Sequence, residues 1–174
     1  MKVRLQLVLI ALMFLFSGNI IFGQSTINFD TDGNWVAAGA LTSYFNHGYS
    51  EGVVTFTSVN TLRNTTAAQD GFPGALGTYS WRLRNTADSK VTATVASGGV
   101  STFSIAVRRW DGSPIPVYTV KYSTNSVDWT SLSNIDGTLL TSSDWFTYNG
   151  TINSDAANIK IEIANTGTTE RIMI

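Results

Sequence analysis

Cysteine is absent from this chain of 174 residues. Its absence excludes a disulfide scaffold, a thiolate metal site, a cysteine nucleophile and a lipoprotein with a lipidated N-terminal cysteine. A domain without disulfides must be stabilised by its own hydrophobic core. About 150 residues suffice for this, because a chain of that size buries about 70% of the surface that it exposes when unfolded.

Charged side chains are also scarce, at 13% of the sequence, with 11 basic and 12 acidic residues. The longest basic cluster is Arg108-Arg109. A protein that follows a phosphate backbone needs many cationic contacts on one face. The sequence therefore predicts no nucleic-acid partner, and its abundant Ser, Thr, Asn and Gly predict a neutral polar surface.

The groups needed for hydrolytic catalysis are few. His47 is the only histidine, and its Phe-Asn-His-Gly-Tyr context does not indicate an activated serine of a Ser-His-Asp triad. Glycoside hydrolysis needs two facing carboxylates. The acidic residues are scattered, and most aspartates lie in turns, where their side chains bond the backbone. We therefore expect no enzymatic activity.

The only long apolar run lies at the N-terminus. Lys2 and Arg4 precede residues 5–16, an apolar stretch interrupted only by Gln6. This pattern is typical of a secretory signal peptide. An uncleaved anchor would need about 20 continuous apolar residues, and polar residues break the run after Phe16. We interpret residues 1–24 as a signal-peptide helix, and we expect an exported protein, extracellular or at the cell surface, that has no membrane contact after cleavage.

Apolar residues recur at every second position in residues 101–109 and 118–122, on either side of a Trp-Asp-Gly-Ser-Pro turn. This period is the signature of half-buried β-strands. Residues 69–78, rich in glycine, form the longest expected loop, and residues 97–99 are interpreted as the turn of a hairpin. Further short strands are expected at residues 27–30, 43–46, 52–58, 61–65, 79–85, 91–95, 129–133, 145–152, 158–164 and 171–174.

About ten short strands without a convincing helix predict an all-β fold, a two-sheet antiparallel sandwich formed by residues 25–174 as one domain. Trp35 is expected in its core. The apolar run that ends at Ile174 has two interpretations: a last strand closes the sheet there, or the coding sequence continues.

Three segments carry a resemblance to a known family: YSWRLRN from Tyr79, GGVSTFSIAVRRWDGSP from Gly98 and YTVKYSTNSVDWTSL from Tyr118. Together they resemble the galactose-binding-like, jelly-roll domains of secreted bacterial multidomain proteins. The resemblance implies a jelly-roll sandwich that stands beside a catalytic, repeat or sorting module. Related jelly rolls bind carbohydrate or calcium. Function does not follow from a fold alone.

Residues 123–129 also resemble a degenerate Asp-box, with Asn125 in place of the usual aspartate and Val127 in place of the glycine. Asp-boxes are structural turns. We expect a hairpin here, with Trp129 covering the core.

An exposed aromatic side chain with polar neighbours is what a sugar ring requires, because the ring has one apolar face and a rim of hydroxyls. Trp110 lies in a loop and is the best candidate for such a platform. The alternative is that Trp110 packs against the core and that the arginines are solvated. The predicted ligand site consists of Trp110, Asp111, Tyr79, Arg82 and Arg84.

The segment Asp-Thr-Asp-Gly-Asn at residues 30–34 alternates oxygen ligands with a glycine turn, as hard cations prefer. Asp30 and Asp32 are therefore the candidate ligands of a structural Ca²⁺. An ordinary turn rich in Asp and Asn is the alternative that explains the same residues.

The sequence as a whole favours a secreted non-catalytic binding or adhesion module with a glycan as its partner. The alternative is a structural accessory domain of a larger secreted or cell-surface protein, whose partner is a neighbouring module of the same polypeptide.

Overall fold

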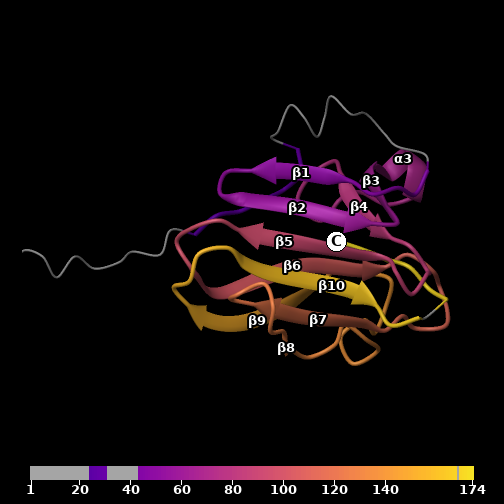
Figure 1. The fold of residues 1–174 in the computed structure, drawn as a ribbon. Helices are drawn as coiled ribbons and strands as arrows, with labels where there is room; N and C mark the ends of the chain where they lie inside the picture. Colours follow the sequence, from indigo (N-terminus) through magenta and orange to yellow (C-terminus); the bar gives the residue numbers. More distant parts are fainter. Residues whose placement is uncertain (1–23, 31–42, 168) are drawn as a thin grey trace, which may run out of the picture.

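The computed structural model describes residues 24–30, 43–167 and 169–174. These residues form two antiparallel sheets packed face to face, which confirms the predicted all-β sandwich (Figure 1). The predicted signal peptide, apart from Gln24, lies outside the described residues, as do Asp32 and Trp35. Within the described ranges, no helix has the length and apolarity needed to cross a bilayer.

The first sheet contains six strands and the second contains five. In spatial order, the first consists of β1 (Gly48–Glu51), β2 (Val54–Val59), β5 (Lys90–Val95), β10 (Ile159–Asn165), β7 (Tyr118–Ser123) and β8 (Thr130–Ser131). The second consists of β3 (Thr61–Thr65), β4 (Ser80–Leu83), β11 (Ile172–Met173), β6 (Val100–Arg109) and β9 (Phe146–Ser154). A single helical turn, α3 (Ala67–Asp70), follows β3 at the start of the predicted long loop.

Most connections carry the chain from one sheet to the other, as in a jelly roll. One of them corrects the sequence-based interpretation of residues 97–99 as a hairpin turn. β5 pairs with β2 and β10, whereas β6 pairs with β9 and β11. Gly98 and Gly99 have φ of 87° and 69°, so they form a corner between the sheets. The alternation of apolar and polar residues alone does not distinguish a hairpin within one sheet from a connection between two sheets.

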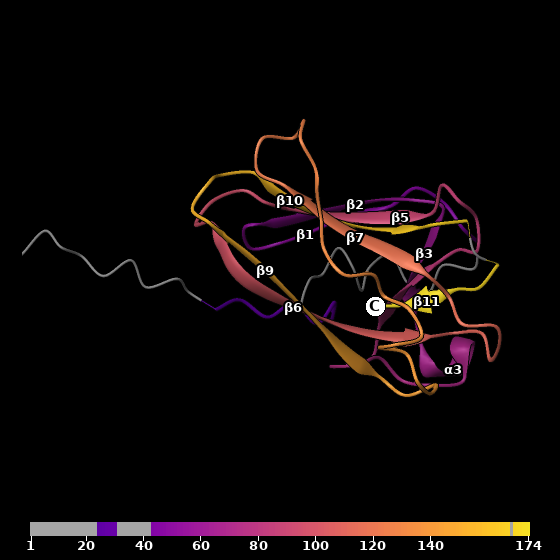
Figure 2. The same cartoon turned by 90° about the horizontal axis from the view of Figure 1, so that it is seen from below.

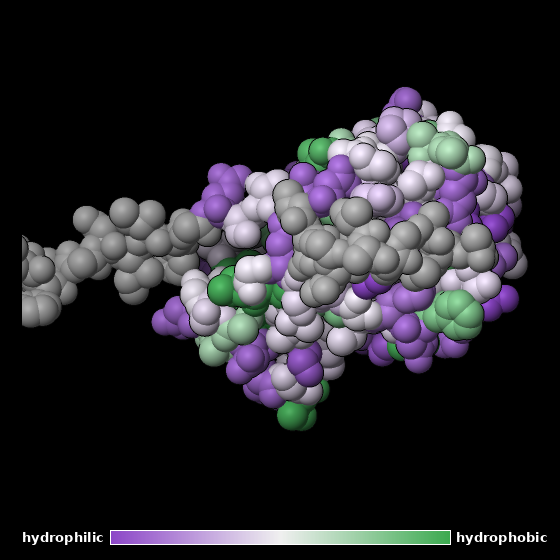
Figure 3. Space-filling model, turned by 90° about the horizontal axis from the view of Figure 1, so that it is seen from above, coloured by the Kyte–Doolittle hydropathy of each residue, from purple (hydrophilic) through white to green (hydrophobic). Residues whose placement is uncertain are grey.

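The inward-facing residues of both sheets form the core. Trp81, Tyr118 and Ile159 are fully buried. Ile172 lies at the centre of the second sheet, between β4 and β6, and confirms the strand predicted near residue 174. The face in Figure 3 is mainly polar, with scattered hydrophobic patches.

The short strand predicted at residues 27–30 is wrong. Phe29 has a φ of 62°, a left-handed conformation that interrupts an extended chain. Its ring instead makes edge-to-face contacts with Tyr49, Phe56 and Trp81, with centroid separations of 5.8–6.1 Å. The segment therefore fills the space between the sheets without joining either ladder.

Trp129 also departs from the prediction, because it is 37% exposed and does not cover the core. The expected turn is present: Asn125 Oδ1 accepts hydrogen bonds from the backbone of Val127 and Asp128, at 2.9 and 2.8 Å. Strand β8 is only two residues long and begins after Trp129. The indole therefore remains at the surface, 4.8 Å from the ammonium group of Lys121.

The outer face of the second sheet carries a row of side chains that the alternation directs away from the core. Arg82 pairs in register with Met173, and Met173 pairs with Arg108. Ile172 and Ile174 face the core, so Met173 between them faces the other side of the sheet. Met173 is nevertheless fully buried. Figure 2 shows α3 on this outer side of the sheet. The row is therefore covered rather than solvated.

Candidate functional site

The structure brings Trp110 together with part of the predicted ligand site. The guanidinium carbon of Arg82 is 4.6 Å from the centre of the indole ring, and that of Arg171 is 3.8 Å from it. The indole nitrogen donates a hydrogen bond of 2.9 Å to Asp70 Oδ1. Two cations and a carboxylate therefore already contact the proposed platform.

Asp111 lies beside Trp110 and is bound to Arg171. Its carboxylate accepts hydrogen bonds from the backbone nitrogen, Nε and Nη2 of Arg171, at 2.7, 3.0 and 2.5 Å. These bonds raise the pKa of the Arg171 guanidinium, against the opposing effect of its burial. Arg82 is paired with the buried carboxylate of Asp70 through a single contact, from Nη1 to Oδ1. The charges of this cluster compensate each other within the fold.

The other two predicted site residues have different neighbours. Arg84 lies 5.2 Å from the ring of Tyr44, and its Nη1 donates a 3.4 Å hydrogen bond to Asn60. Tyr79 packs partly against the core, and its backbone nitrogen donates a 3.0 Å hydrogen bond to Asp30 Oδ1. Ligand binding by these five residues stays a prediction.

Asp30, the described member of the candidate calcium pair, is engaged by the backbone. Its two carboxylate oxygens accept hydrogen bonds from the amides of Thr78 and Tyr79, at 2.7 and 3.0 Å. In the part of the chain that the structure describes, no three acidic or histidine side chains gather in a way that could hold a metal. Asp32 lies outside that part, and the calcium site stays a prediction.

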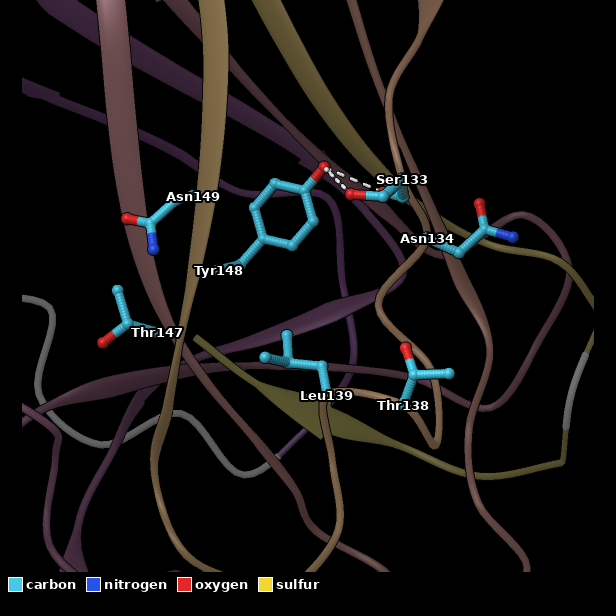
Figure 4. Close-up of a pocket in the computed structure, with 7 residues that line it drawn as sticks. All are labelled: Ser133, Asn134, Thr138, Leu139, Thr147, Tyr148 and Asn149. Atoms are coloured by element: carbon cyan, nitrogen blue, oxygen red, sulfur yellow. Dashed lines mark hydrogen bonds between the residues drawn. The ribbon is translucent and has the colours of Figure 1, made fainter.

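A groove that the sequence did not indicate lies between β9 and the segment that follows β8 (Figure 4). Its volume is about 320 Å³. Tyr148 reaches from β9 across the gap, and its hydroxyl donates a 2.8 Å hydrogen bond to the carbonyl of Ser133. The groove is lined by Ser133, Asn134, Thr138, Leu139, Thr147, Tyr148 and Asn149.

The lining contains hydroxyl groups, amides, one aromatic ring and one aliphatic side chain, but no charged side chain. Asn134 and Thr138 are exposed on one wall, and Thr147 and Asn149 are exposed on the other. Ser104 of β6 donates a 2.7 Å hydrogen bond to Asn149 Oδ1. This bond orients the amide so that its nitrogen is directed away from Ser104.

Trp145 and Arg108 lie at one end of β9, beside the groove. Trp145 precedes β9 and shares the outward face with Thr147 and Asn149, because successive side chains in a strand alternate. Its indole nitrogen donates a 3.2 Å hydrogen bond to the carbonyl of Pro73. Arg108 lies next to it, with its guanidinium carbon 5.7 Å from the centre of the Trp145 ring.

One feature of the sequence pointed to this region: the alternation of residues 145–152 places Trp145 and Thr147 on the same face. It could not show that residues 133–139 approach β9, because these residues form irregular chain at the edge of the opposite sheet.

No family model matches the chain, and no curated protein matches it in sequence. Among solved structures, it is similar to the N-terminal CBM22-1–GH10 part of endo-1,4-beta-D-xylanase 10B from Clostridium thermocellum, complexed with xylohexaose. The TM-score is 0.47 and the sequence identity is 15%. The match covers 76% of this chain and 27% of the xylanase chain.

Proposed function

We propose that this protein is a non-catalytic module that binds a glycan in the groove between β9 and residues 133–139. The observation that carries the proposal is the composition of the groove lining, which combines hydroxyl and amide groups with Tyr148 and Leu139 and contains no charged side chain. A sugar ring has hydroxyls around its rim and apolar C–H groups on its faces. The hydroxyl and amide groups of the lining can bond the hydroxyls, and the partly exposed Leu139 can contact the C–H groups.

The size and rigidity of the groove support the same ligand class. A volume of 320 Å³ lies at the lower end of the range of about 300–1,000 Å³ that is common for ligand sites. One wall is a strand of the second sheet, and the hydrogen bonds between Tyr148 and Ser133 tie the other wall to it. Groups held in place before binding lose little entropy when the ligand arrives.

The test is a glycan array probed with residues 25–174, followed by calorimetry on the ligands that it identifies. In the double variant Asn134→Ala/Asn149→Ala, one exposed amide is removed from each wall. We expect it to weaken binding at least tenfold and to leave the thermal unfolding midpoint nearly unchanged, because both side chains are exposed.

The matched control is Thr130→Ala/Thr151→Ala, which removes two exposed side chains from β8 and β9 outside the groove. It should bind like the wild type. Binding that is lost in Trp110→Ala but unaffected by Asn134→Ala/Asn149→Ala would place the site at the sequence-predicted platform instead. An array without any binding would overturn the proposal and favour the structural accessory domain.

A further inference from the structure

Arg108 and Arg82 occupy equivalent positions on the outer face of the second sheet. Both pair in register with Met173, one from β6 and the other from β4. Each is 8% exposed. The two arginines can be compared directly, because they have the same burial on the same face of the sheet. Any difference between their partners must come from the groups that cover them.

Their ionic partners differ. Arg82 is paired with the carboxylate of Asp70. Arg108 forms no ion pair with the described residues, and its one hydrogen bond to them runs from Nε to the carbonyl of Arg109, at 3.5 Å. The acidic groups that act on it, Asp144 and Asp70, do so beyond ion-pair distance. A buried charge without a partner is destabilising.

Aromatic rings hold Arg108 in place. The guanidinium carbon lies 3.3 Å from the centre of the Phe72 ring and 5.7 Å from that of Trp145. Such contacts are favourable and fix the plane of the group, but they do not satisfy its N–H donors. A planar guanidinium with free terminal nitrogens matches the two oxygens of a carboxylate.

The position of Arg108 relates it to the groove. Val107 pairs with Phe146, so Arg108 lies beside Trp145 at the end of β9. Thr147, which lines the groove, follows two residues later on the same face. Two residues of a strand span about 7 Å. A ligand in the groove that extends past Thr147 therefore meets Trp145 and then Arg108.

We propose that Arg108 binds an acidic substituent of the glycan, so that the protein selects saccharides that contain a uronic acid. This inference rests on the proposed function, since the groove must hold the rest of the ligand. The neutral lining contacts the sugar ring, and Arg108, whose guanidinium lies beside Trp145, supplies a cation at that end of β9. The carboxylate would compensate the charge that the fold leaves unpaired.

Calorimetry with three oligosaccharides tests the inference: oligogalacturonate, its methyl ester and neutral oligogalactan. We expect the wild type to bind the acid at least tenfold more tightly than the ester. Arg108→Gln should remove this preference and leave the affinity for the ester unchanged. Lys121→Gln is the charge-matched control, because it also removes one cation but lies on the other sheet, and it should keep the preference.

The outcomes separate the two proposals. Equal binding of acid and ester by the wild type would overturn the uronate inference and leave glycan binding intact, and this comparison needs no variant to fold. An acid preference that survives Arg108→Gln would also overturn it. A sulfated oligosaccharide that binds more tightly than the uronate, with the same dependence on Arg108, would support the anion site but reassign it to sulfate. An absence of binding to any glycan would overturn the proposed function itself.

Discussion

Trp110 and Asp70 are joined by a 2.9 Å hydrogen bond from the indole nitrogen to Oδ1, although 40 residues separate them in the sequence. The same carboxylate oxygen is paired with Arg82 of β4. Asp70 is the last residue of α3. One buried carboxylate therefore connects the helical turn, the second sheet and the loop after β6.

Asp70→Asn should destabilise the protein by about 3 kcal/mol or more, because it leaves the buried guanidinium of Arg82 without its counter-charge. Asp111→Asn is the comparison, since its pair with Arg171 is partly exposed and should contribute less. Urea unfolding of both variants checks this. An equal loss of unfolding free energy in the two variants would contradict the view that Asp70 is the more important counter-charge.

Trp110→Ala should lower the free energy of unfolding by roughly 3 kcal/mol, since truncation of a packed aromatic residue typically costs that much. The two guanidiniums that contact the indole also lose their cation–π partner. The variant that remains folded should bind glycan with unchanged affinity. Unchanged stability together with lost binding, measured by urea unfolding and calorimetry, would show that Trp110 is a ligand platform after all.

Gly99→Ala should be strongly destabilising, and Gly98→Ala only mildly so. Both residues have positive φ, which costs roughly 1 kcal/mol for alanine. A Cβ on Gly98 would meet nothing within 4 Å, whereas one on Gly99 would lie 2.5 Å from the carbonyl oxygen of Ser154. Backbone atoms there must shift. Thermal unfolding of the two variants should differ by several degrees, and equal midpoints would contradict the close approach.

His47 should make stability depend on pH. Burial lowers its pKa below the ordinary value of 6.5, and nearby Arg63 lowers it further, against a backbone hydrogen bond at Thr61 that raises it. The unfolded chain therefore binds a proton first as the pH falls. The contribution of neutral His47 to the free energy of unfolding should be fully present above about pH 6.5. It should be lost as the pH falls through the lower pKa of the folded state.

NMR titration of the single imidazole gives the folded-state pKa without ambiguity of assignment. Urea unfolding between about pH 5 and pH 7.5 gives the accompanying loss of stability, which His47→Gln should reduce. A folded-state pKa above 6.5 would contradict the prediction.

The sequence predicts those features of the fold that depend on adjacent residues, and it does not predict those that depend on contacts between residues far apart in the chain. Alternation locates β6, β7, β9 and β10 because each is encoded by adjacent residues. The same alternation cannot show which sheet a strand joins, and so it misassigns the corner at Gly98 and Gly99. It also predicts a strand at Phe29, where the backbone adopts a left-handed conformation to place the ring among other aromatics.

The candidate site follows the same rule. The Arg82 guanidinium carbon lies 4.6 Å from the centre of the Trp110 indole, although β11 separates β4, which carries Arg82, from β6, which precedes Trp110. The sequence named both residues as members of one candidate site. It could not identify Asp70 as their shared partner, because that contact depends on where the loop after β3 folds back. Nor could it find the groove, whose two walls belong to the edges of different sheets.

The position of β11 has a consequence for how the protein acquires its structure. This strand is the last of the described strands in sequence order, yet it lies between β4 and β6 and joins them into one sheet. Ile174 then exchanges two hydrogen bonds of 2.9 Å with Trp81. Without these residues, β3–β4 and β6–β9 are separate ladders with open edges. Folding of the second sheet is therefore expected to wait for this strand, which closes both edges in one step.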